Sequence, residues 1–69
     1  MNIMQALREY SKEKGIPLTK IGAYRYEEGA SHFDVTQWNA LVTNPSFKEV
    51  TCFIPALGGQ YKVGLYTLN

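Results

Sequence analysis

With 69 residues the chain is long enough for one small domain, and seven Lys and Arg residues against six Asp and Glu residues give a net charge of +1. This balance lacks the basic excess of proteins that hold duplex DNA through its phosphates. A single cysteine excludes an internal disulfide bond, and no long apolar run predicts a leader or a membrane span. We therefore expect one compact domain over residues 1–69 in a reduced, cytoplasmic setting, without membrane contact.

Residues 2–14 carry the pattern of an amphipathic helix. Asn2 is placed as the N-cap, and Gln5, three residues later, completes a capping box. One stripe of this helix is apolar; it carries Ile3, Ala6, Leu7 and Tyr10. Gly15 follows as the residue that ends the helix, and Pro17 prevents its continuation.

Residues 19–27 predict a strand with two different faces. One face carries Ile21, Ala23 and Arg25, and the other carries Gly22, Tyr24 and Tyr26. The pattern alone leaves open which face is buried, and we favour Ile21 and Ala23 as the inward residues because some of the five tyrosines must reach the surface. The sequence also leaves open whether residues 29–33 form a turn or a short strand.

Residues 34–43 predict a second helix. Asp34 is its N-cap, and Phe33 and Trp38 have the spacing of a hydrophobic staple across that cap. This position indicates a core role for Trp38, in preference to a binding hot spot. The helix ends before Pro45.

The last third of the chain predicts a β-hairpin, with strands at residues 47–54 and 60–68 and a turn that contains Gly58 and Gly59. An apolar face with Val50, Cys52, Ile54, Val63 and Leu65 needs a cover of helices. The sequence therefore predicts a small α+β two-layer sandwich, in which two helices pack on a three-stranded, mainly antiparallel sheet in the order α-β-α-β-β.

No residue pattern predicts catalysis, a cofactor or a metal site. His32 and Cys52 are the only residues of their kinds, and Cys52 falls between Val50 and Ile54 on the strand face predicted to be buried. The Gly pair is better explained as a turn than as a phosphate loop, because no helix follows it. The adjacent acids at residues 27–28 are expected to be solvated.

The candidate working surface is the other face of the predicted sheet. We assign partner binding to a set of aromatic and basic residues: Tyr24, Arg25, Tyr26, Phe53, Lys62 and Tyr66. These residue types are enriched at protein interfaces, but they also form stacking platforms for single-stranded nucleic acid. A purely structural role, with the tyrosines completing the core, is the third option.

We expect a non-enzymatic protein-interaction module, a small intracellular regulator or inhibitor of the phage or mobile-element type that docks on a larger host protein. The near-neutral charge favours a protein partner over nucleic acid. The alternative is a single-stranded nucleic-acid-binding protein that uses the aromatic sheet face, and an enzyme that uses His32 is a weaker third option. Self-association as a homodimer is open as well, because a core of this size supplies only about 3–5 kcal/mol.

Overall fold

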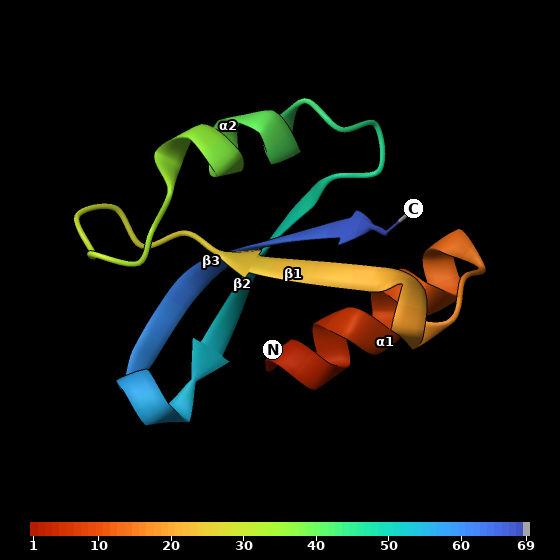
Figure 1. Cartoon of the computed structure of the whole chain (residues 1–69). Helices are drawn as coiled ribbons and strands as arrows, with labels where there is room; N and C mark the ends of the chain where they lie inside the picture. Colours follow the sequence, from red (N-terminus) through yellow and green to blue (C-terminus); the bar gives the residue numbers. More distant parts are fainter. Residues whose placement is uncertain (69) are drawn as a thin grey trace.

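Two helices alternate with three strands along the chain, which the computed structural model describes over residues 1–68 (Figure 1). The elements are α1 (Ile3–Lys14), β1 (Ile21–Arg25), α2 (Val35–Val42), β2 (Lys48–Ile54) and β3 (Gly59–Thr67). Short 3-10 turns at Leu18–Lys20 and Pro55–Leu57 precede β1 and β3. The α+β class and the predicted order of elements are confirmed. No helix among residues 1–68 has the length and apolar character needed to cross a membrane.

The sheet is antiparallel throughout, and its strand order is β1-β3-β2. β2 and β3 form the predicted hairpin, in which Val50 pairs with Val63. Gly58 adopts a left-handed conformation with φ of 69° that ends the connecting turn, while Gly59 already belongs to β3. β1 is shorter than predicted, because a 3-10 turn occupies residues 18–20, and residues 29–33 contain turns but no strand.

α1 covers one face of the sheet. Asn2 and Gln5 form the predicted capping box, and Gly15 ends the helix in a left-handed conformation. The core under this helix combines side chains from α1 and all three strands: Ala6, Tyr10, Ile21, Cys52, Val63 and Leu65. The buried Tyr10 hydroxyl donates a hydrogen bond to the Ser46 carbonyl oxygen, so its polar atom is satisfied.

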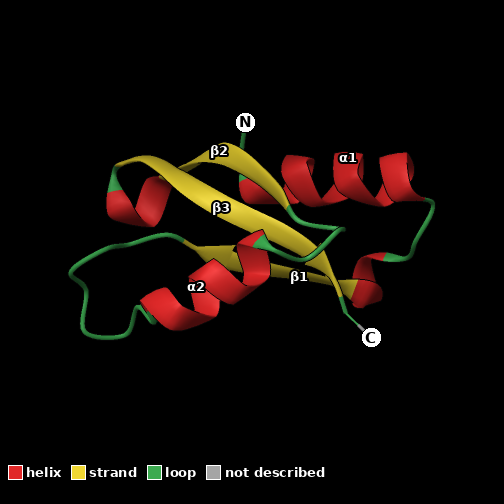
Figure 2. Cartoon of the chain, turned by 90° about the horizontal axis from the view of Figure 1, so that it is seen from above, coloured by secondary structure: helices red, strands yellow, loops and turns green. Residues whose placement is uncertain are grey.

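α2 packs on the opposite face of the sheet, as Figures 1 and 2 show. Trp38 is only 6% exposed, and its ring lies against Tyr26 and Phe47, with centroid distances of 5.0 and 5.5 Å. We expected both helices over the Val50 face. The sheet instead has a helix on each side, because Tyr24 and Tyr26 make its second face aromatic and Trp38 covers them.

β1 therefore has both of its faces covered in part. Ile21 is buried against the α1 core, as we favoured, whereas Ala23 is exposed. Tyr24 and Tyr26 on the other face are half-buried. The prediction that only one face of β1 is buried was incomplete, because each face of this strand contributes to a different helix–sheet contact.

Candidate functional site

Tyr24 and Tyr26 belong to an aromatic cluster under α2. Tyr26 makes edge-to-face contacts with Phe33 and Trp38 at centroid distances of 4.9 and 5.0 Å. Tyr24 lies 5.8 Å from Phe33, and its hydroxyl accepts a hydrogen bond from the Asp34 backbone N–H at 2.9 Å. These contacts hold the staple residue and the N-cap of α2 against the sheet. The two tyrosines therefore have a structural function within this cluster.

Lys62 and Tyr66 lie on the same sheet face as the aromatic cluster. The Lys62 Nζ atom is 5.6 Å from the centre of the Tyr26 ring, a cation–π distance. The Tyr66 ring lies directly over Gly22, where a Cβ atom would come within 2.4 Å of its Cζ atom. Lys62 is exposed and Tyr66 is half-buried. Their assignment to partner binding stays a prediction.

Arg25 lies on the other sheet face and takes part in a small charged cluster. Its guanidinium is 5.9 Å from the centre of the Tyr61 ring, and its Nε donates to Glu27 Oε2 at 3.0 Å. His32 Nε2 lies 3.0 Å from the same oxygen. The hydrogen bond from Arg25 holds the pKa of the Glu27 carboxyl below its ordinary value. Glu27 is thus paired, contrary to the expected solvated turn.

His32 and Cys52 lie in different surroundings. The His32 side chain is 65% exposed and pairs with Glu27, whereas Cys52 is fully buried in the α1 core, as predicted, and burial raises the pKa of its thiol. Within residues 1–68 no three His, Cys, Asp or Glu side chains gather closely enough to hold a metal ion.

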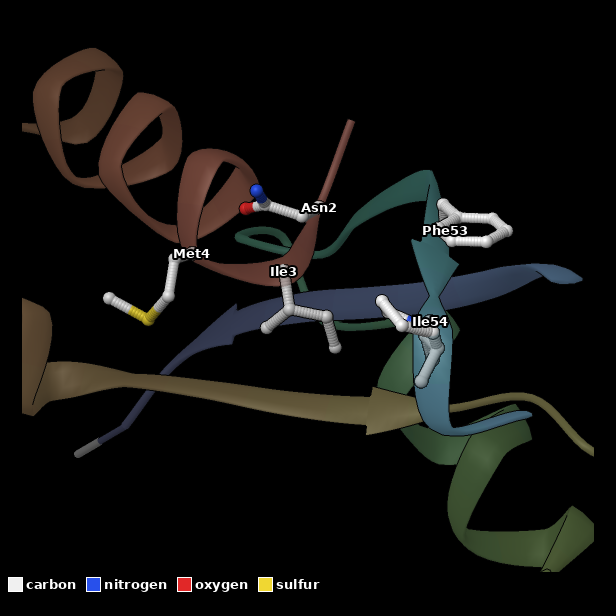
Figure 3. Close-up of a pocket in the computed structure, with 6 residues that line it drawn as sticks. Asn2, Ile3, Met4, Phe53 and Ile54 are labelled. Atoms are coloured by element: carbon white, nitrogen blue, oxygen red, sulfur yellow. The ribbon is translucent and has the colours of Figure 1, made fainter. Parts of the chain in front are cut away.

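An apolar groove lies between the start of α1 and the end of β2 (Figure 3). Its volume is about 270 Å³, and no charged side chain lines it; the lining residues are Asn2, Ile3, Met4, Phe53, Ile54 and Pro55. Figure 3 shows Ile3 of α1 and Ile54 of β2 on either side of the gap. The Met1 carbonyl oxygen accepts a hydrogen bond from the Phe53 N–H at 2.8 Å, which fixes the chain ahead of α1 beside β2.

Large exposed apolar side chains line this groove or flank its lining segments in the sequence. Met1, Met4, Phe53 and Leu57 are each between 40% and 50% exposed, and all belong to the groove lining or lie within two residues of it in sequence. We call the groove and these four side chains the apolar end. Of the six residues predicted to bind a partner, only Phe53 belongs to it. Among the other residues of the apolar end, Met4 has a usable sequence signal, because this large apolar side chain falls outside the apolar stripe of α1.

Comparison of the chain with known protein families, with curated proteins and with solved structures found no match.

Proposed function

We propose that the chain is a non-enzymatic protein-interaction module that docks on a larger protein through its apolar end. One observation carries the proposal: an uncharged groove of about 270 Å³ has large, half-exposed apolar side chains around it. Contiguous exposed apolar surface is unfavourable in water and is a mark of binding sites. Phe and Met are enriched in interface cores, and the flexible Met side chains adapt to different partner shapes.

The open shape of the groove favours a protein partner over a small molecule. Small-molecule pockets usually have volumes of about 300–1,000 Å³ and enclose most of their ligand. The groove is open to solvent and is formed by only two chain segments, residues 2–4 and 53–55. It suits one or two apolar side chains of a partner, while the exposed Met4 and Phe53 extend the contact around them.

Docking through the apolar end supports a role for the chain as a regulator or inhibitor in the cytoplasm. A chain of 69 residues can cover a site on a larger protein without enclosing a substrate of its own. Because the groove has no charged lining, affinity comes from burial of apolar surface and depends weakly on salt. A single-stranded nucleic-acid binder, the alternative, requires affinity that falls steeply as salt rises.

The test is affinity capture from the native lysate with and without nuclease, followed by titration of the captured protein. Phe53→Ala and Met4→Ala are compared with Leu18→Ala, which changes a side chain of similar exposure outside the apolar end. We expect each groove variant to weaken binding by about tenfold or more and the control to bind normally. Circular dichroism confirms that each variant is folded.

Two results would overturn the proposal. Equal losses for Leu18→Ala and Phe53→Ala would show that the apolar end is not the docking surface. Material that disappears on nuclease treatment, with binding that depends steeply on salt and on Lys62, would establish the nucleic-acid alternative.

A further inference from the structure

The charged side chains are unevenly distributed between the two helices. α1 carries five of them on its solvent side: Arg8, Glu9, Lys12, Glu13 and Lys14. Residues 35–47, which include all of α2, carry none. Seven of the eight α2 residues are nevertheless not buried, and Trp38 is the exception. The outer surface of α2 is thus neutral and open, which is unusual because exposed helix faces are normally charged.

A stripe of α2 has the spacing of a helix-packing seam. At 100° per residue, Val35, Asn39 and Val42 fall within about 60° of one another, to one side of the buried Trp38. Val35 and Val42 are 51% and 47% exposed, among the most exposed large apolar side chains of the described chain. We call these three residues the α2 stripe.

We propose that the α2 stripe binds the α2 stripe of a second copy of this chain, with the two helices antiparallel about a twofold axis. In this arrangement Val35 of one copy lies near Val42 of the other, so each valine of the stripe meets a valine. Asn39 lies close to the axis, where its amide can donate to and accept from the same amide of the other copy.

Charge favours a second copy as the occupant. An isologous contact places identical residues on both sides, so a charged patch would repel itself, whereas the α2 stripe has no charge to repel. A neutral surface also offers nothing to a strongly acidic or basic partner. The nearest carboxylate, that of Asp34, is already held by the backbone N–H groups of Thr36 and Gln37.

The contact is expected to be weak and to leave the apolar end free. α2 is only about 12 Å long, and interfaces that bury less than about 1,200 Å² form transient complexes. α2 and the groove-lining α1 lie on opposite sides of the sheet (Figure 1). Self-association through α2 is therefore independent of the proposed docking function, and a dimer would present two grooves.

The first experiment measures the wild-type chain alone. Sedimentation equilibrium and ¹⁵N-labelled NMR are recorded between roughly 50 µM and 2 mM, the range in which so small an interface associates. We expect the mass to rise toward that of two chains, with concentration-dependent amide shifts confined to α2 and little effect of salt. A single-chain mass throughout, or shifts centred on the apolar end instead, would overturn the proposal.

The second experiment introduces charge into the neutral α2 stripe. Val35→Lys/Val42→Lys and Val35→Glu/Val42→Glu chains should each be monomeric through self-repulsion, and their equimolar mixture should associate in a salt-sensitive manner. Leu18→Lys is the control, because it adds a charge at a similarly exposed position outside α2. Persistent association of either double variant alone, or dissociation by Leu18→Lys, would overturn the proposal. Val35→Thr/Val42→Thr, which adds no charge, serves if a charged variant fails to fold.

Discussion

Gly64 lies where two aromatic side chains press against the middle of the sheet. A Cβ atom there would come within 2.4 Å of a Phe47 ring carbon and 3.1 Å of a Trp38 ring carbon. Because these rings hold each other in an edge-to-face contact, neither can move without loss of packing. We expect Gly64→Ala to lower the free energy of unfolding by about 1–3 kcal/mol, measured by urea denaturation.

Gly22→Ala is the matched comparison for this prediction. A Cβ atom at Gly22 would approach Tyr66 equally closely, but the half-buried Tyr66 ring has solvent to move into. We therefore expect Gly22→Ala to lower the free energy of unfolding by less than Gly64→Ala does. Equal losses of unfolding free energy in the two variants would mean that the Trp38–Phe47 contact does not hold the rings in place over Gly64.

The Arg25–Glu27 ion pair predicts how one residue contributes to acid sensitivity. In the native chain the pKa of the Glu27 carboxyl lies below its ordinary value of 4.5, so the unfolded chain binds the proton more readily than the native chain. The stabilisation by this pair is thus complete above about pH 4.5 and is lost as the pH falls through the native pKa. Glu27→Gln should flatten that part of the stability curve.

The measurement is the urea midpoint of the wild type and of Glu27→Gln as a function of pH. The two curves should differ near neutral pH and converge in acid. The Glu13–Lys48 pair, in which Lys48 lowers the pKa of the Glu13 carboxyl, is unchanged in both chains and contributes to the acid sensitivity that remains. A difference that is constant across the acid range would show that the loss is not electrostatic.

Each helix is fixed by a different N-cap. Asp34 Oδ1 accepts from the backbone N–H groups of Thr36 and Gln37 at 2.9 and 3.1 Å, whereas Asn2 and Gln5 exchange two reciprocal hydrogen bonds. Asp34→Ala should lower the free energy of unfolding by about 1–2 kcal/mol. Asp34→Asn retains the side-chain acceptor, so it should lower the free energy of unfolding by only about a few tenths of a kcal/mol. If the two variants lose equal stability, charge at the helix end outweighs capping.

The elements that local signals define were predictable, and their arrangement was not. Asn2, Gly15 and Asp34 set the ends of the helices, since caps act within one turn. The side on which α2 packs depends on Trp38 meeting Tyr26 and Gly64, residues distant in sequence from one another. Strand order likewise depends on pairings that no alternation pattern specifies.

The groove was missed for the same reason. Ile3 and Ile54 are far apart in sequence and come together only when α1 packs beside β2. Periodicity assigned both residues to a core, and they do pack toward the α1 side of the sheet. Periodicity did not show that α1 begins beside the end of β2. The helix therefore leaves the last part of the α1 side of the sheet uncovered.

The two helix–sheet contacts share the central strand β3. Val63 and Leu65 contribute to the α1 core, while Gly64 between them supports Trp38. Loss of β3 would therefore disrupt both sides at once. We expect Trp38 fluorescence, which reports the α2 side, and reactivity of the buried Cys52 thiol, which reports the α1 side, to give the same urea midpoint. An earlier fluorescence transition would show that α2 unfolds separately.

The central position of β3 also determines the order in which the fold can assemble. β3 follows β1 and β2 in the sequence, yet it separates them in the sheet, and Ile21 of β1 pairs with Thr67. β1 thus has no strand to pair with until almost the whole chain is present. Closing a loop of this length opposes folding by its entropy, so we infer a transition state that is reached late, after the local β2–β3 hairpin has formed.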